Sequence, residues 1–94
     1  MEGRVVVVRT VSAGVHVGTL ARHAGREVTL RNATRVWRWR GANTLHELAL
    51  RGADREKYTR ISEKVPEILL TQAIEIIPCT EEAAANLLHS RWLA

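Results

Sequence analysis

The stretch TRVWRWRGANTLHELALRG, residues 34–52, carries the sharpest chemical pattern in the sequence. Interpreted as a strand that turns at a Gly-Ala corner into a helix, it places Trp37 and Trp39 on one face of the strand. The other face carries Val36, Arg38 and Arg40. This separation of indoles from guanidinium groups predicts a small basic domain that binds a ligand, although it names no reaction.

The second half of this stretch has the signals of a short helix. Thr44 followed three residues later by Glu47 matches a capping box. In this motif the threonine hydroxyl accepts a hydrogen bond from the N3 amide, and the glutamate carboxylate reaches back to the cap amide. Gly52 then ends the helix. Its apolar face comprises Leu45, Leu48 and Ala49. A helix of about two turns is unstable alone, so we expect it to pack on the sheet, where it would close one open end.

The N-terminal part predicts a meander of four strands. Residues 4–11 are dense in β-branched residues and contain the continuous apolar run 5–8 between two arginines, which is typical of a strand covered on both faces. In the next strand, 15–22, Gly18 indicates a bulge or a close backbone approach. A tight connection over 23–26 leads to a strand over 27–31. Asn32 and Ala33 are then predicted to turn the chain into the strand that begins at Thr34.

The C-terminal part is less regular. We expect a loop over 53–60, a short strand over 61–65 that Pro66 interrupts, and a strand over 72–77. Thr80 is predicted to cap a second helix. The apolar stripe of that helix comprises Ala84, Leu87, Leu88 and Trp92. The predicted fold class is therefore α+β: a small antiparallel β-barrel or roll, an SH3-like meander, with two short helices in one domain.

The charge is unevenly distributed along the 94 residues. Residues 1–60 carry twelve basic against five acidic side chains, a net charge of +7, whereas residues 61–94 carry two against five, or −3. Arginine outnumbers lysine twelve to two, and guanidinium groups bind phosphate or carboxylate in a bidentate manner. The excess favours an anionic partner. The alternative is that it only makes the surface soluble.

Motifs for catalysis, metals and nucleotide loops are missing from the sequence. The four histidines and Cys79 form no CxxC, HxxxH or HExxH pattern, and neither GxGxxG nor GxxxxGK[ST] occurs. Cys79 precedes a predicted helix, which could activate a thiol, but a buried inert thiol is the better interpretation. We therefore expect no catalytic residue, no metal and no cofactor. A single cysteine and the short apolar run 5–8 indicate a soluble protein of a reducing compartment, without a membrane partner.

Arginines beside aromatic residues are the remaining candidates for a ligand site. Guanidinium groups bind phosphate while indoles stack on bases, a combination used for nucleotides and single strands. The predicted ligand-binding residues are Arg22, Arg26, Arg35, Arg38, Trp39, Arg40 and Tyr58. The competing interpretation is that the tryptophans belong to the core and the arginines are ordinary solvated charges.

Three stretches resemble an uncharacterised family of short proteins from tailed-phage genomes. They are VVVRTVSAGVHVGTL (6–20), VWRWRGANTLHELA (36–49) and RISEKVPEILLTQAIEIIPCTEEAAANL (60–87). The resemblance carries no catalytic motif, and it implies a phage accessory protein of the host cytoplasm. By analogy with other small basic phage proteins, it would sequester a cyclic or ADP-ribose-type signal of host defence, or bind nucleic acid.

The small size of the chain bears on these alternatives. A domain of this length has little room for an enclosed pocket of several hundred Å3, so a nucleotide site would form most easily between subunits. The first hypothesis is therefore a homo-oligomer that sequesters a nucleotide-type ligand. The others are a nucleic-acid-binding β-barrel and a protein-binding inhibitor of a host defence system.

Overall fold

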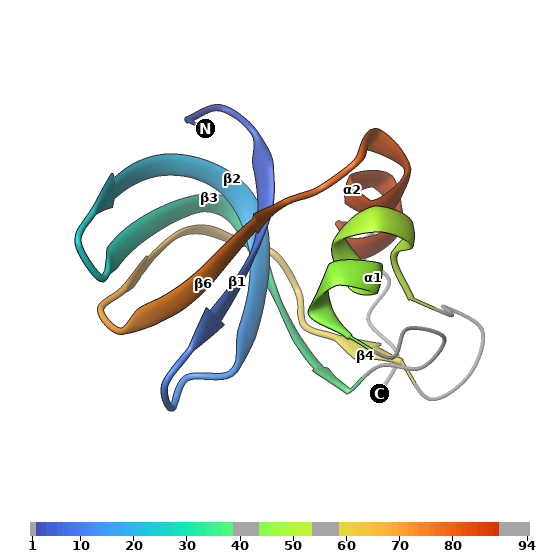
Figure 1. Ribbon diagram of the computed structural model, residues 1–94, viewed down its shortest axis with the longest axis horizontal. Coiled ribbons are helices and arrows are strands. Elements are labelled where there is room, and N and C mark those ends of the chain that lie inside the picture. Colours follow the sequence, from blue (N-terminus) through green and yellow to red (C-terminus); the bar gives the residue numbers. More distant parts are fainter. Residues whose placement is uncertain (1, 39–43, 54–58, 89–94) are drawn as a thin grey trace.

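The computed structural model describes residues 2–38, 44–53 and 59–88. They form two helices and an antiparallel sheet of six strands (Figure 1). The strands are β1 (Val5–Thr10), β2 (Val15–Ala24), β3 (Glu27–Arg38), β4 (Arg60–Ile61), β5 (Val65–Leu70) and β6 (Ala73–Pro78). The helices are α1 (Leu45–Arg51) and α2 (Glu81–Leu87). The predicted α+β class with two short helices is confirmed.

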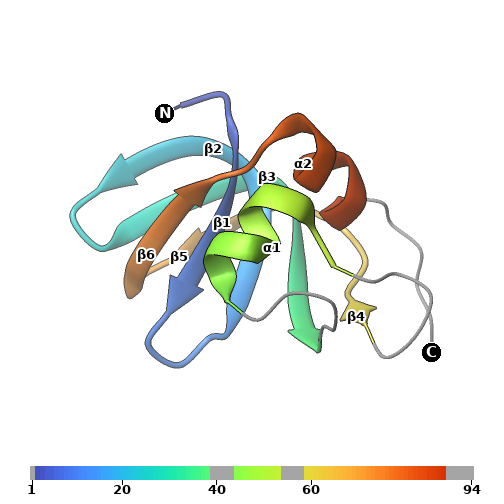
Figure 2. The ribbon, with the colours of Figure 1, turned by 45° about the vertical axis from the view of Figure 1, so that its right-hand side comes forward.

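The longest strand, β3, is the centre of the sheet. The strand order is β4-β3-β2-β1-β6, and β5 pairs with the same edge of β3 as β4 does, nearer the start of that strand. Figures 1 and 2 show the sheet strongly curled, with both helices on one side. No ladder joins β5 to β6 in the described part of the chain, so the sheet is curled but open.

Strand β1 is buried on both faces, as its continuous apolar run predicts. Val6, Val7 and Val8 are each 0% exposed. Val7 packs in the core beneath the helices, whereas Val6 and Val8 point into the curl of the sheet. Successive residues of one strand thus supply two separate cores.

The two cores lie on opposite faces of the sheet. The helix-side core contains Val7, Val17, Val36, Leu48, Ala49, Ala53, Ile61, Cys79, Ala83 and Leu87. The core inside the curl contains Val6, Val8, Leu20, Val28, Leu30, Ala33, Leu70 and Ala73. All of these side chains are apolar, with branched aliphatic residues in the majority.

The predicted turn at Asn32 and Ala33 is wrong, because β3 continues through both residues. The pairing of β2 with β3 shifts there from Val17↔Thr34 to Thr19↔Arg31, which inserts one extra residue into β3. Asn32 adopts a positive φ of 50°, which asparagine tolerates better than most residues. The turn signal therefore marks a β-bulge.

Gly18 lies opposite this bulge, and the predicted close approach is confirmed. A Cβ added at Gly18 would lie 3.0 Å from the Cβ of Ala33 and 3.1 Å from the carbonyl oxygen of Arg31. Only a residue without a side chain lets the two backbones come so close.

Strand β5 was not predicted, because Pro66 was expected to interrupt the chain. Proline lacks an N–H group, but an edge strand tolerates this loss where the missing donor would face solvent. β5 pairs only with β3 and includes Pro66. The predicted strand over 61–65 is wrong beyond Ile61, where β4 ends, whereas the strand predicted over 72–77 corresponds to β6.

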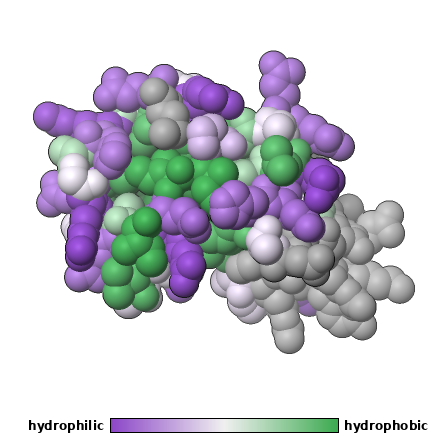
Figure 3. All heavy atoms as spheres, viewed as in Figure 1, coloured by the Kyte–Doolittle hydropathy of each residue, from purple (hydrophilic) through white to green (hydrophobic). Residues whose placement is uncertain are grey.

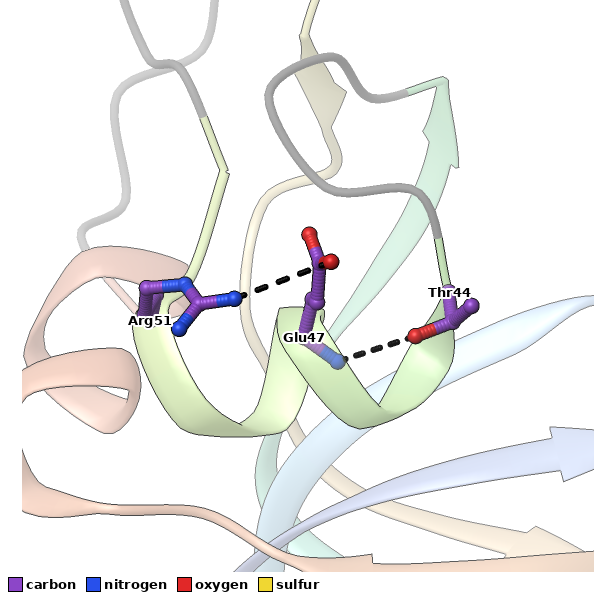
Figure 4. A network of polar contacts seen from close by, with 3 residues as sticks. All are labelled: Thr44, Glu47 and Arg51. Carbon is purple, nitrogen blue, oxygen red and sulfur yellow. Dashed lines mark hydrogen bonds and ion pairs between the residues drawn. The ribbon is translucent and has the colours of Figure 1, made fainter.

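The capping hydroxyls predicted for both helices are confirmed. The Oγ1 atom of Thr44 accepts a hydrogen bond from the amide of Glu47 at 3.2 Å, and the Glu47 carboxylate lies 3.6 Å from the guanidinium of Arg51 (Figure 4). In α2, Thr80 Oγ1 accepts from the amide of Ala83 at 3.1 Å. Leu48 and Ala49 of α1 are buried in the helix-side core, as the apolar face predicts.

Hydrogen bonds tie the end of α1 to α2. The Thr80 hydroxyl donates to the carbonyl of Leu50 at 2.7 Å. The side chain of Asn86 forms two hydrogen bonds with the backbone of Ala53. Its Oδ1 accepts from the Ala53 amide and its Nδ2 donates to the Ala53 carbonyl, both at 2.9 Å. Of the stripe predicted for α2, Leu87 is buried while Ala84 and Leu88 are partly buried; Trp92 lies outside the described residues.

Aspartate at either Val7 or Val8 should prevent stable folding, because each change leaves an unpaired carboxylate in a core at a cost of several kcal/mol. Val11→Asp is the matched control, since Val11 is 59% exposed just beyond the same strand. Circular dichroism and urea denaturation should show that both core variants are unfolded and that the control keeps nearly wild-type stability. A folded Val7→Asp or Val8→Asp variant would contradict burial on both faces of β1.

Gly52→Ala should destabilise the protein more than Gly25→Ala. Both glycines have positive φ, +79° and +60°, and Gly52 combines it with a ψ of −162°, a region that is essentially restricted to glycine. The backbone cost of alanine, roughly 1–3 kcal/mol at such positions, is therefore expected to be the larger at Gly52. A Cβ at Gly52 would in addition lie 2.5 Å from Cγ of Asn86, whereas one at Gly25 meets nothing within 4 Å. Urea denaturation of the two variants measures the difference, and equal losses of stability would show that the Asn86 contact is not rigid.

Candidate anionic-ligand site

Three of the seven predicted ligand-binding residues have described side chains. Trp39, Arg40 and Tyr58 lie outside the described residues, as does the side chain of Arg38, so their roles stay predictions. The three described side chains, those of Arg22, Arg26 and Arg35, are all exposed.

Arg35 lies apart from the other two arginines. It follows Glu27, at the start of β3, by eight residues, a separation of up to about 26 Å along an extended strand. A Cβ added at Gly14 would lie 3.0 Å from Nε of Arg35, so this guanidinium covers the β1–β2 connection. Among the three described side chains, Arg35 is therefore placed at another part of β3 than the end that Arg22 and Arg26 adjoin.

The pairing partner of Arg35 on β2 is the buried residue His16. Burial lowers the pKa of His16, the hydrogen bond from Nε2 to the carbonyl of Ala13 at 2.9 Å opposes this shift, and the positive charge of Arg35 adds to it. A histidine held neutral in this way is a structural group. We therefore assign His16 no part in ligand binding.

Arg22 lies in a row of side chains that crosses three strands. It pairs with Thr29 of β3, and Thr29 pairs with Leu69 of β5. Together with Ala24 and Glu27 these three residues line an open hollow of about 380 Å3, which we call the outer hollow. Leu69 is 58% exposed there, so the floor of the hollow is partly apolar.

A second bulge turns Arg22 toward this hollow. The pairing shifts from Leu20↔Leu30 to Arg22↔Thr29, which inserts one extra residue into β2. Without the shift, Arg22 would share the face of Leu20, whose side chain lies in the core inside the curl. The bulge thus aims the guanidinium at the outer face, a role that bulges commonly have next to functional sites.

The charges around the outer hollow alternate in sign. Arg31 lies on the neighbouring row, where its Nε is 3.9 Å from a carboxylate oxygen of Glu67. Arg22 has no ion pair within the described ranges, and neither does Glu27. The hollow therefore presents the guanidinium of Arg22 without an ion pair, the carboxylate of Glu27, the hydroxyl of Thr29 and the exposed apolar side chain of Leu69.

A separate apolar surface lies along β6. Figure 3 shows apolar residues in the middle of the face on which β1 and β6 lie, with hydrophilic residues around them. An open hollow of about 330 Å3 beside β6 is lined by His23, Gly25, Ala73, Ile74, Glu75 and Ile76. Arg26 lies at the same hairpin, where its carbonyl accepts a hydrogen bond from the amide of Ala73 at 2.9 Å.

The exposure of Trp37 contradicts the interpretation that the tryptophans belong to the core. Its side chain is 53% exposed, so the expectation that the tryptophans form core is wrong for this residue, whereas its neighbour Val36 is fully buried in the helix-side core. The predicted separation of faces is correct for this pair.

Cys79 is a free cysteine and is buried, as the preferred interpretation of this thiol predicts. Burial raises the pKa of Cys79 to about 11, an effect that the nearby positive charge of Arg4 partly opposes. Among the residues that the structure describes, no group of three or more histidine, cysteine or acidic side chains could hold a metal ion. Neither of the described helices has the length and apolar character required to cross a membrane.

Sequence reasoning missed Glu27, Thr29 and Leu69. The alternation of Thr29 with Val28 and Leu30 indicates that Thr29 faces outward, and this signal was available in the sequence. Leu69 could not be assigned without β5. Only the pairing of β3 with β5 shows that Leu69 lies next to Thr29.

Comparison with known proteins gives one match. Residues 3–87 match the sequence model of a family described as a domain of unknown function, DUF6948. No curated protein and no solved structure matches the chain significantly.

Cys79 should react slowly with Ellman's reagent in the native protein at pH 8. A pKa raised from 9.0 to about 11 reduces the thiolate fraction about a hundredfold, and burial slows access further. Unfolding in urea should restore the rate of an ordinary thiol, and Cys79→Ser should give no signal. Because the folded-state pKa is the higher one, this group's contribution to stability is complete below pH 9 and is lost as the pH rises toward 11. Rapid native labelling at pH 8 would contradict the inert role.

Proposed function

The chain belongs to the DUF6948 family, whose description names no activity, and we propose from its site that it binds a nucleotide-type anionic ligand in the outer hollow and sequesters it. Arg22 binds phosphate, and Leu69 supports an apolar part of the ligand. The role is binding without chemical transformation. In the setting that the resemblance to tailed-phage proteins implies, the ligand is a signal of host defence in the host cytoplasm.

The observation that carries this proposal is the position of Arg22. A bulge turns its guanidinium out of the sheet, and it forms no ion pair with an acidic group of the described residues. A hydroxyl and an apolar side chain follow it in one row. A guanidinium binds phosphate through paired hydrogen bonds, and the Thr29 hydroxyl can donate a further one. The volume of about 380 Å3 lies within the range of small-molecule sites.

The charge pattern favours a small ligand over a nucleic acid. A protein that follows a nucleic-acid backbone neutralises several phosphates with neighbouring cations. On this face Arg31 is already paired with Glu67, and Glu27 would repel a second phosphate near Arg22. A nucleic-acid-binding barrel and a protein-binding inhibitor remain the alternatives.

The openness of the hollow bears on the oligomeric state and the fold. Small-molecule sites usually bury most of their ligand, and one copy of the chain leaves this hollow open. We therefore extend the proposal to a homo-oligomer in which a second copy covers the ligand. We also propose that the curled sheet is a half-open barrel of the SH3-like type.

Arg22→Ala should weaken the binding of adenosine 5′-monophosphate (AMP), our nucleotide probe, about tenfold or more, because one charge-assisted contact to phosphate contributes roughly 1.5–3 kcal/mol. Arg51→Ala is the control of equal charge change, since Arg51 lies on α1 and pairs with Glu47. Isothermal titration calorimetry measures both variants. Affinity that is unchanged in Arg22→Ala, or lost equally in both variants, would overturn the proposed site.

Light scattering and ultraviolet absorbance of the purified protein test sequestration directly. An oligomer that retains nucleotide through purification is the expected result. A single-stranded oligonucleotide serves as the competing ligand, because binding through several phosphates weakens steeply with salt. A nucleotide-free monomer that binds the oligonucleotide with a steep salt dependence would favour the nucleic-acid alternative.

A further inference from the structure

We infer that Glu27 sets the ligand class of the outer hollow, and that it selects a ligand with one phosphate group and free sugar hydroxyls, such as a nucleoside monophosphate. This inference rests on the proposed function. It concerns the carboxylate of Glu27, which lies diagonal to Arg22 on the neighbouring strand. The basic character of the chain gave no reason to consider this residue.

The position of Glu27 follows from the strand register. Arg22 pairs with Thr29 and Ala24 pairs with Glu27, so Glu27 is the diagonal neighbour of Arg22 on the same face. Diagonal neighbours on paired strands lie roughly 7–8 Å apart. At this backbone separation the two long side chains can contact the 5′ phosphate and the sugar hydroxyls of one nucleotide.

The chemistry of a carboxylate suits those hydroxyls. An ionised carboxylate only accepts hydrogen bonds, and the two vicinal hydroxyls of a ribose can donate to its two oxygens. Glu27 is exposed, and within the described part of the chain it has no ion pair that would have to break first. With phosphate on Arg22 and ribose on Glu27, Thr29 lies beside both parts of the ligand. Leu69 lies next to Thr29 on β5.

The same charge acts against additional phosphates. In water, two unit charges of equal sign at about 7 Å disfavour each other by roughly threefold in affinity. Arg22 offsets this repulsion for the one phosphate that it binds, whereas further phosphates find no second arginine among the residues that line the hollow. The hollow is thus expected to prefer mono- over triphosphates.

The test compares three probes on three proteins by isothermal titration calorimetry. The probes are AMP, ATP and 2′,3′-dideoxy-AMP, and the proteins are the wild type, Glu27→Gln and Glu27→Ala. The wild type should bind AMP roughly threefold to tenfold more tightly than either of the other probes. Glu27→Gln should lose the discrimination against ATP, and Glu27→Ala should in addition bind AMP and dideoxy-AMP equally.

Glu63→Gln is the control, because Glu63 is an exposed glutamate between β4 and β5 and the charge change is the same. Circular dichroism should show that all variants are folded, since Glu27 is exposed at the first position of β3. The control should keep the wild-type preferences.

The outcomes separate the two proposals. If AMP binds and Arg22→Ala weakens it, but the Glu27 variants keep the wild-type preferences, the inference about Glu27 is overturned while the proposed function stands. Tighter binding of ATP than AMP by the wild type would overturn it as well. If no probe binds the wild type, the proposed function fails, and the inference fails with it.

Discussion

Burial of β1 on both faces is the constraint on which the other elements of the structure depend. A strand with apolar side chains on both sides must be covered twice, and the chain supplies two different covers. Val7 lies under the helices, while Val6 and Val8 are enclosed because the sheet curls over them. The helices therefore cover one face of β1 and the curled sheet covers the other. Removing either cover would expose apolar surface to water.

The pairing of β2 with β3 connects this core to the candidate site. In an evenly paired ladder, alternate residues of a strand stay on the same face of the sheet. This ladder contains two bulges, one with an extra residue in β3 and one with an extra residue in β2, and each changes the face on which the following residues lie. Gly18 permits the first bulge by its lack of a side chain. The second bulge turns Arg22 from the interior to the outer face. The irregularities of the ladder thus decide which cation lines the outer hollow.

The candidate site differs from the expected one for a physical reason. The sequence draws attention to the arginines beside the tryptophans, because they are adjacent in the chain. Residues that are adjacent across strands form the hollow instead, and Glu27 and Leu69 are 42 residues apart along the chain. Glu67, which pairs with Arg31, and Glu27, which lines the hollow with Arg22, also show that a basic sequence can present both signs of charge on one surface.

Local signals in the sequence determined the elements that depend on neighbouring residues: the doubly buried β1, the caps at Thr44 and Thr80, the end of α1 at Gly52 and the close approach at Gly18. The tertiary structure alone decided what depends on distant pairing. It made Asn32 a bulge, because β2 continues opposite it, and it made Pro66 part of a strand, because β3 offers an edge that needs no donor there. It also brought β5 beside Thr29, since long-range register has no signature in any single stretch.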